Sequence, residues 1–187
     1  MDFEEKVIQK RIVYQGHYLR AEEQTVLLPD GKEAQREIVI PPDAVGILAL
    51  DRSGKVYLVR QYRPAIQRVT LEIPAGILEP GENSLETAKR ECEEEIGMTP
   101  RQLKPLFSFY HSVGFSTGKI EVFLALDLIP NPTTHPDSGE FLEVIILPFD
   151  ELYQRVLRGE IVDSKSIIAI LWYRQLMERQ HNPALNK

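Results

Sequence analysis

The chain has 187 residues, of which 43% are hydrophobic and 27% charged, a composition typical of a globular protein with one substantial core. Its formal net charge of -6 argues against nucleic acid or an anionic membrane as the main partner. Short apolar runs, an N-terminus without an apolar signal region and a single cysteine predict a cytoplasmic protein without membrane spans or internal disulfides.

The N-terminal part of the sequence has the alternating pattern of β-strands. Three strands are predicted, over residues 7–14, 17–28 and 34–40. Pro29-Asp30-Gly31 is a turn signal between the last two, and Pro41-Pro42 ends the pattern. We therefore predict a small antiparallel β-sheet unit over residues 1–40 and a main domain over residues 41–187.

The rest of the chain contains more strands and then helices. Strands are predicted over residues 44–51, 55–62, 69–73, 103–110, 120–128 and 140–147. Helices are predicted over residues 84–96, 149–158 and 164–180. The segment 131–139 is rich in proline, threonine and aspartate and is predicted to be a loop.

The helix over 84–96 has clear start and stop signals. Asn83 or Ser84 can cap its start, and Asn83 with Glu86 has the spacing of a capping box. Gly97 can end it in the left-handed conformation. An apolar stripe, predicted to face the core, contains Leu85, Ala88, Cys92 and Ile96.

Three glutamates of this helix, Glu91, Glu94 and Glu95, lie at positions i, i+3 and i+4. Such spacing brings like charges together and costs roughly 0.2–0.5 kcal/mol per pair in helix stability. The cluster is useful if a hard divalent cation such as Mg²⁺ binds among the carboxylates. From these three residues alone, an acidic surface helix is an equal alternative.

The surrounding residues have the spacing of a known motif. Gly76 precedes Glu82 by six positions, and Arg90-Glu91 follows Glu82 after seven further residues. Glu94-Glu95, Ile96, Gly97 and Met98 then complete the pattern. This stretch resembles the Nudix box, G-x5-E-x7-R-E-U-x-E-E-x-G-U, with Cys92 at its first bulky apolar position.

The resemblance implies a fold and a reaction. The fold is an α/β/α sandwich with a mixed sheet, and family members hydrolyse a nucleoside diphosphate linked to another moiety. Arg90 is expected to orient the glutamates by ion pairing. The implied metal is Mg²⁺, with Mn²⁺ as a possible substitute. The implied metal site consists of the carbonyl of Ala75 with Glu91, Glu95, Glu94 and, as support at the helix entrance, Glu82.

Three flanking segments resemble the ADP-ribose pyrophosphatase branch of the family. They are Arg36-Glu37-Ile38-Val39, Arg60-Gln61-Tyr62-Arg63 and Glu72-Ile73-Pro74-Ala75-Gly76. Members of this branch are homodimers whose N-terminal strands help to form the adenine pocket, so a homodimer that binds a nucleotide sugar is expected.

The branch resemblance also suggests substrate contacts. Arg36 and Glu37 are expected at the adenosine part and Arg63 at the diphosphate. Further candidates are Tyr18, as a stacking residue, Ile77 and Gly114. For Tyr18 a core position is the stronger alternative, because aromatic residues on strands usually pack inside.

The substrate and the general base remain open. Val113 and Gly118 stand where the branch commonly has proline and glutamate, and Pro41-Pro42-Asp43 replaces its H-P-G segment. Another nucleotide sugar, a broad housecleaning activity or a non-catalytic sensor are therefore alternatives. Glu140 is predicted as the base, with Asp137 or Glu94 as alternatives.

Overall fold

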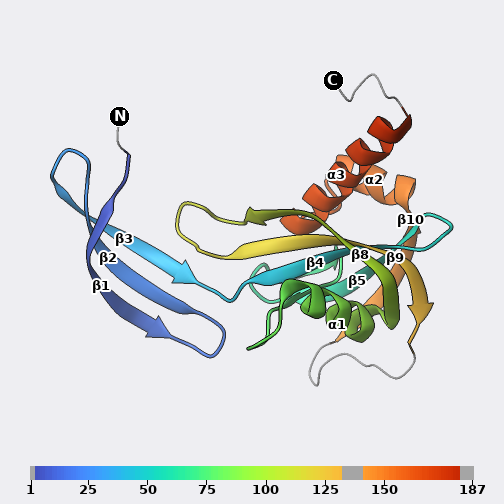
Figure 1. Cartoon of the computed structure of the whole chain (residues 1–187), viewed down its shortest axis with the longest axis horizontal. Helices are drawn as coiled ribbons and strands as arrows, with labels where there is room; N and C mark the ends of the chain where they lie inside the picture. Colours follow the sequence, from blue (N-terminus) through green and yellow to red (C-terminus); the bar gives the residue numbers. More distant parts are fainter. Residues whose placement is uncertain (1–2, 132–140, 182–187) are drawn as a thin grey trace. The chain divides into compact units, whose positions relative to one another are not determined.

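The computed structural model describes residues 3–131 and 141–181 and shows a small sheet and a larger sheet with helices (Figure 1). Two compact units can be distinguished. The first contains the described residues up to Asp43 together with Phe109–Ile120, and the second contains Ala44–Ser108 with the described residues from Glu121 onward. The division at residue 40 stays a prediction. No helix in the described part of the chain is long and apolar enough to cross a membrane.

The first unit is built on a three-stranded antiparallel sheet in the order β1-β2-β3, which confirms the predicted N-terminal sheet. Its strands are β1 (Lys6–Gln15), β2 (Arg20–Leu27) and β3 (Glu33–Ile40). Gly31, with φ of +83°, forms the predicted turn between β2 and β3. The strand predicted over 17–28 starts too early, because the Gly16 N–H donates to the Leu19 carbonyl at 2.9 Å and closes a tight turn first.

The second unit contains a seven-stranded mixed sheet between helices, which confirms the α/β/α sandwich. The strand order is β10-β5-β4-β9-β8, with β6 beside β5 and β7 beside β4. The strands are β4 (Ala44–Leu50), β5 (Lys55–Arg63), β6 (Arg68–Glu72), β7 (Ala75–Ile77), β8 (Met98–Tyr110), β9 (Lys119–Pro130) and β10 (Leu142–Pro148). The helices are α1 (Ser84–Ile96), α2 (Phe149–Leu157) and α3 (Ser164–His181). Figure 1 shows α1 on one side of the sheet and α2 and α3 on the other.

Strand β4 is the centre of this unit and is buried on both faces. Val45, Ile47 and Ala49 share one face with the buried α1 residues Ala88 and Cys92. Ile73 and the aliphatic part of Lys165 lie close to Gly46, on the other face. A strand covered on both faces reads as a continuous apolar run, as residues 45–50 do.

Helix α1 has the predicted bounds and both predicted caps. The Asn83 side chain accepts from the N–H groups of Leu85 and Glu86, and the Glu86 side chain accepts from the N–H of Asn83. Gly97 ends the helix with φ of +65°. The predicted apolar stripe is wrong at Leu85, which is 48% exposed, because the packed cluster begins only one turn later, at Ala88.

The start of β8 differs from the prediction, whereas the burial of Cys92 agrees with it. Strand β8 begins at Met98, five residues before the predicted start, and therefore contains Pro100 in addition to Pro105. It lies at the edge of the sheet, where a missing backbone N–H is tolerated. Cys92 is fully buried, and burial raises the pKa of its thiol to about 12, so it behaves as a small apolar residue.

Candidate active site

Strand β7 and helix α1 together position the acidic residues of the site. β7 pairs with β4, with Gly76 opposite Val45 and Ala75 opposite Gly46. The Ile47 N–H donates to the carbonyl of Pro74 at 2.8 Å, so the segment that leads into β7 is also fixed to the central strand. Helix α1 packs against β7 and brings two of its glutamates to this segment.

The carboxylate of Glu91 lies directly on the backbone of Gly76. A Cβ atom placed on Gly76 would be 1.7 Å from Glu91 Oε1, far inside any allowed contact. Glu91 is only 9% exposed, so its carboxylate does not lie on a solvated face of the helix. The glycine at position 76 is therefore required by the space that this carboxylate occupies.

Glu95 reaches the same backbone segment from one turn further along α1. Its Oε2 atom accepts a hydrogen bond from the N–H of Ala75 at 2.8 Å, and the residue is 5% exposed. Burial of a carboxylate is costly unless hydrogen bonds or opposite charges compensate. Two nearly buried carboxylates thus lie at two consecutive residues of the backbone, Ala75 and Gly76.

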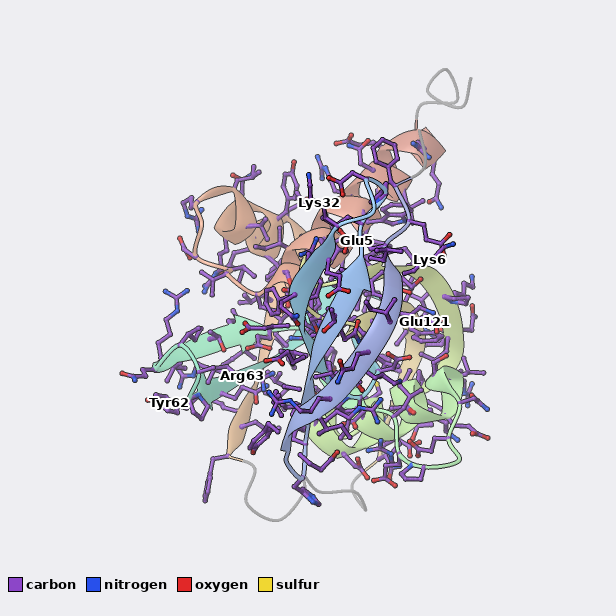
Figure 2. The ribbon with its side chains drawn as sticks, turned by 90° about the vertical axis from the view of Figure 1, so that its left-hand side faces the viewer. Glu5, Lys6, Lys32, Tyr62, Arg63 and Glu121 are labelled. Carbon is purple, nitrogen blue, oxygen red and sulfur yellow. The ribbon has the colours of Figure 1, made fainter. Side chains whose placement is uncertain are left out.

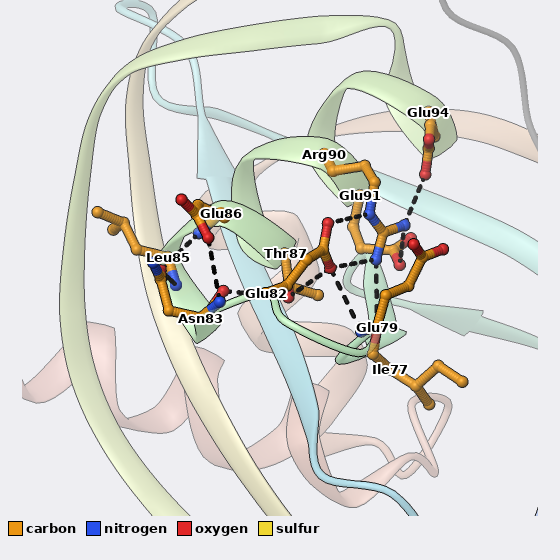
Figure 3. A network of polar contacts seen from close by, with 10 residues as sticks. All are labelled: Ile77, Glu79, Glu82, Asn83, Leu85, Glu86, Thr87, Arg90, Glu91 and Glu94. Atoms are coloured by element: carbon orange, nitrogen blue, oxygen red, sulfur yellow. Dashed lines mark hydrogen bonds and ion pairs between the residues drawn. The ribbon is translucent and has the colours of Figure 1, made fainter.

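Arg90 holds the acidic residues of the helix in place (Figure 3). Its Nη1 group donates to Glu91 Oε1 and to Glu94 Oε2, each at 2.8 Å. Its Nε group donates to Glu82 Oε1 at 2.9 Å, and Nη2 donates to the carbonyl of Ile77 at 3.2 Å. The predicted orientation of the glutamates by Arg90 through ion pairs is confirmed.

The carboxylate of Glu82 is hydrogen-bonded to Arg90 and Thr87. Its Oε2 atom accepts from Arg90 Nη2 at 3.1 Å and from the Thr87 hydroxyl at 2.9 Å. The hydrogen bond from Arg90 is the main cause that lowers the pKa of Glu82 to about 2, so it stays a carboxylate at neutral pH. The geometry favours Glu82 as the anchor that fixes Arg90, and Thr87 is a supporting residue that the sequence did not point to.

The donor atoms of this region suit a hard divalent cation. Carboxylates of Glu91, Glu94 and Glu95 with the carbonyl of Ala75 would provide only oxygen ligands, as Mg²⁺ and Mn²⁺ prefer. The bare glycine at position 76 gives these groups the space that a side chain would fill. Within residues 3–131 and 141–181, no three acidic, histidine or cysteine side chains are already arranged as a complete metal site.

Arg63 lies at the end of β5, next to Tyr62 (Figure 2). It donates to Glu72 twice, from Nε to Oε1 at 2.9 Å and from Nη2 to Oε2 at 2.8 Å. The hydrogen bond with Glu72 is the main cause that raises the pKa of Arg63, and the charge of Glu95 contributes. Arg60 forms an ion pair with Glu143 instead, and Arg68 lies opposite Arg63 on β6.

Ile77, on β7, belongs to the second unit, and the remaining predicted substrate residues belong to the first. Arg36 is paired with Glu5, with N–O distances of 2.9 and 2.6 Å. Glu37 follows it on β3 and therefore points to the opposite face of the sheet. Tyr18 is 58% exposed and lines a pocket of about 290 Å³ with Arg20 and Pro41, so the alternative of a core position is wrong.

The loop between β8 and β9 contains two positions that belong to the branch pattern, Gly114 and Gly118. Gly114 lies in an exposed turn. A Cβ atom on Gly118 would be 2.1 Å from His111 Nε2 and 2.8 Å from Pro41 Cγ, so the imidazole takes the space that a glutamate would need. The predicted base Glu140 and its alternative Asp137 lie outside the described residues.

Comparisons with known proteins agree with this geometry. The family model described as the NUDIX domain matches residues 40–169, and the model described as the nucleoside diphosphate sugar hydrolase N-terminal domain matches residues 5–39. The chain is 40% identical to the ADP-ribose pyrophosphatase of Bacillus subtilis (strain 168), covering 94% of this chain and 95% of the relative. It is 38% identical to the methanol dehydrogenase activator of Bacillus methanolicus, with the same coverages of 94% and 95%.

More distant proteins share the same architecture. An ADP-ribose pyrophosphatase of Mycobacterium tuberculosis (strain ATCC 25618 / H37Rv) is 34% identical over 91% of this chain and 82% of the relative. A crystal structure of an ADP compounds hydrolase superposes with a TM-score of 0.85 at 20% identity, covering 96% of this chain and 98% of that chain. The similarity of fold therefore extends over nearly the whole chain.

Proposed function

The chain belongs to the Nudix family of hydrolases, and from that premise we propose that it hydrolyses the diphosphate bond of a nucleotide sugar. The preferred substrate is ADP-ribose, and the products are AMP and ribose 5-phosphate. The observation that carries this proposal is the meeting of Glu91 and Glu95 at the backbone of Ala75 and Gly76. The names of the relatives at 40% and 34% identity support the choice of ADP-ribose.

The proposed reaction depends on a divalent metal and on charge placement. Mg²⁺, or Mn²⁺ in its place, would neutralise the diphosphate and lower the pKa of a bound water. The carbonyl of Ala75 and the carboxylates of Glu91, Glu94 and Glu95 would hold it. Arg90 keeps these carboxylates in place and Glu82 fixes Arg90. The chain's main task is then to position groups and compensate charge, as in phosphoryl transfer generally.

Six residues are proposed to bind the substrate. Nη1 of Arg63 donates no hydrogen bond to a described residue, and we assign it to the diphosphate. Arg36, Glu37 and Tyr18 are assigned to the adenosine part, which would require Arg36 to release Glu5. Ile77 and Gly114 complete the proposed contacts. Glu140 is the proposed base, with Glu94 and Asp137 as alternatives.

The test is a panel of substrates with Mg²⁺ present, followed by chromatography of the products. ADP-ribose is expected to give AMP and ribose 5-phosphate at the highest kcat/KM, and removal of metal with EDTA is expected to abolish turnover until Mg²⁺ or Mn²⁺ is restored. The panel also contains ADP-glucose, GDP-mannose and diadenosine polyphosphates. A stronger preference for one of these would reassign the substrate, and tight binding without turnover would replace the hydrolase by a sensor.

We further propose that the protein is a homodimer joined through β1. All ten residues of β1 are exposed in the single chain, and Val7, Ile8, Ile12, Val13 and Tyr14 are each at least 50% exposed. One edge of β1 has no strand partner within the described chain, and an exposed apolar edge strand invites pairing with another chain. The partner's β1 region would cover this surface.

The expected mass in solution is therefore twice the chain mass of 21.4 kDa, measured by light scattering after size-exclusion chromatography. Ile12→Asp is expected to shift the protein to the monomer and lower its activity, because the second copy helps to form the nucleotide pocket. Leu157→Asp, on α2, is the control, since Leu157 is also exposed, at 58%, and receives the same change. A monomeric wild-type protein would refute this arrangement.

A further inference from the structure

A row of alternating charges leads from the first turn of α3 to Arg63. Lys165 Nζ lies 3.0 Å from Asp163 Oδ2 and donates to Glu72 Oε2 at 2.5 Å. Glu72 in turn accepts two hydrogen bonds from Arg63 and one from the Thr70 hydroxyl, at 2.6 Å. The Lys165 and Glu72 side chains are only 8% and 3% exposed, whereas Arg63 is 41% exposed.

The same turn of α3 also fixes the backbone that leads to the metal-site segment. Ser166 Oγ accepts from the Ile73 N–H at 2.8 Å and donates to Asp163 Oδ2 at 2.5 Å. Ser166 is fully buried. Gly46 lies 3.7 Å, measured from a Cβ atom built on it, from Lys165 Cδ, so the lysine passes over the central strand at van der Waals distance.

The charges in this row balance only when Lys165 is present. Glu72 and Asp163 bring two negative charges into a mostly buried place, and Arg63 and Lys165 bring two positive ones. Burial raises the pKa of Glu72, but hydrogen bonding with Arg63 and the charge of Lys165 outweigh it and hold the pKa at about 2. Glu72 is therefore charged at neutral pH and needs both cations.

We propose that Lys165 is a positioning residue that acts on substrate binding through Glu72 and Arg63. Lys165 and Arg63 both donate to Glu72 Oε2, so Lys165 provides part of the positive charge that compensates the buried carboxylate. Arg63 can then keep its Nε and Nη2 groups on Glu72 and present Nη1 to the diphosphate. Without Lys165, Arg63 would be the only cation on Glu72 among the described residues and would be drawn inward. This inference rests on the proposed function.

A double-mutant cycle on kcat and KM tests the proposal. Lys165→Met and Arg63→Gln are each expected to raise KM for ADP-ribose at least roughly 10-fold, because binding of the diphosphate is weakened in both. In the Arg63→Gln background, Lys165→Met is expected to change KM by less than about 2-fold, because the residue through which it acts is gone. Lys165→Arg should recover most of the wild-type KM.

The matched control is Arg174→Met, which removes another paired cation of α3, held by Asp150 and Glu178. It should leave KM within about 2-fold of the wild type. Equal, multiplicative losses from Lys165→Met in both backgrounds would overturn the proposal and leave Lys165 with a general structural role. Circular dichroism of each variant shows whether it is folded, and Lys165→Gln replaces Lys165→Met in the cycle if the methionine variant is not.

A second readout separates this proposal from the proposed function. If the wild-type protein hydrolyses no substrate of the panel, the proposed function fails, but the coupling of Lys165 to Arg63 can still be measured. Nitrogen-15 NMR of the Arg63 Nε–H group is then compared in wild type, Lys165→Met and Arg174→Met. A changed shift or exchange rate in Lys165→Met alone would support the coupling, and an unchanged signal would overturn it.

Discussion

Replacement of Glu95 by glutamine is expected to lower kcat for ADP-ribose hydrolysis by roughly 10²–10³-fold, which corresponds to about 2.7–4 kcal/mol of transition-state stabilisation. Glutamine keeps the size of the side chain and an oxygen that can still accept from the N–H of Ala75, so the helix and β7 should stay in place. What is lost is a negative charge in a nearly buried position, 5% exposed, beside the second carboxylate of the site. Steady-state kinetics at saturating substrate and Mg²⁺ measure the effect.

The matched control is Glu93→Gln on the same helix. Glu93 accepts a hydrogen bond from the Thr99 hydroxyl at 2.7 Å, and its position does not belong to the fixed part of the box. The same chemical change should alter kcat by less than about 3-fold. If Glu95→Gln retains more than a tenth of the wild-type rate, or if Glu93→Gln loses as much, the assignment of Glu95 as a metal ligand fails.

The acidic cluster itself could be predicted from sequence because its spacing is local. Residues at i, i+3 and i+4 of one helix are neighbours by the geometry of the helix alone, and both caps of α1 are marked by residues within its own ends. The ion pairs of Arg90 with Glu91 and Glu94 follow from the same short distances along the chain.

The features that the sequence did not reveal depend on contacts between distant segments. β7 has only three residues and was not predicted, because a strand of that length shows no alternation, and its existence depends on pairing with β4. The burial of Glu91 and Glu95 follows from that pairing. Lys165 is 93 residues from Glu72, and no local pattern indicates that the two side chains meet.

The errors in the first unit have a similar origin. The alternating pattern around Tyr18 is continuous in sequence, but the hydrogen bond between Gly16 and Leu19 turns the chain before β2 begins. Gly118 is a different case, because it does depart from the branch's glutamate, and the imidazole of His111 occupies the space beside it. Only the three-dimensional arrangement shows that the missing side chain at position 118 leaves room for a side chain seven residues earlier in the chain.

Gly76→Ala is the second substitution with a large expected effect, and it should separate function from stability. The added methyl group would be 1.7 Å from Glu91 Oε1, so the carboxylate must leave its place on the backbone. The backbone of Gly76 does not have a positive φ, so alanine is compatible with its conformation. The free energy of unfolding is therefore expected to change by no more than about 1 kcal/mol, because only the end of a flexible side chain has to move. The rate, in contrast, should fall by roughly 10²-fold, because the displaced carboxylate no longer stands beside Glu95.

Gly54→Ala is expected to behave in the opposite way, and it is the matched control. Gly54 has φ of +77° in the turn between β4 and β5, and no atom lies within 4 Å of a Cβ built there. A left-handed alanine should cost about 1–2 kcal/mol of stability and leave kcat unchanged. Urea unfolding and steady-state kinetics on both variants measure the two effects. A Gly76→Ala protein with more than half of the wild-type rate would mean that the position of Glu91 on Gly76 has no part in catalysis, and the site built on Ala75 and Gly76 would have to be abandoned.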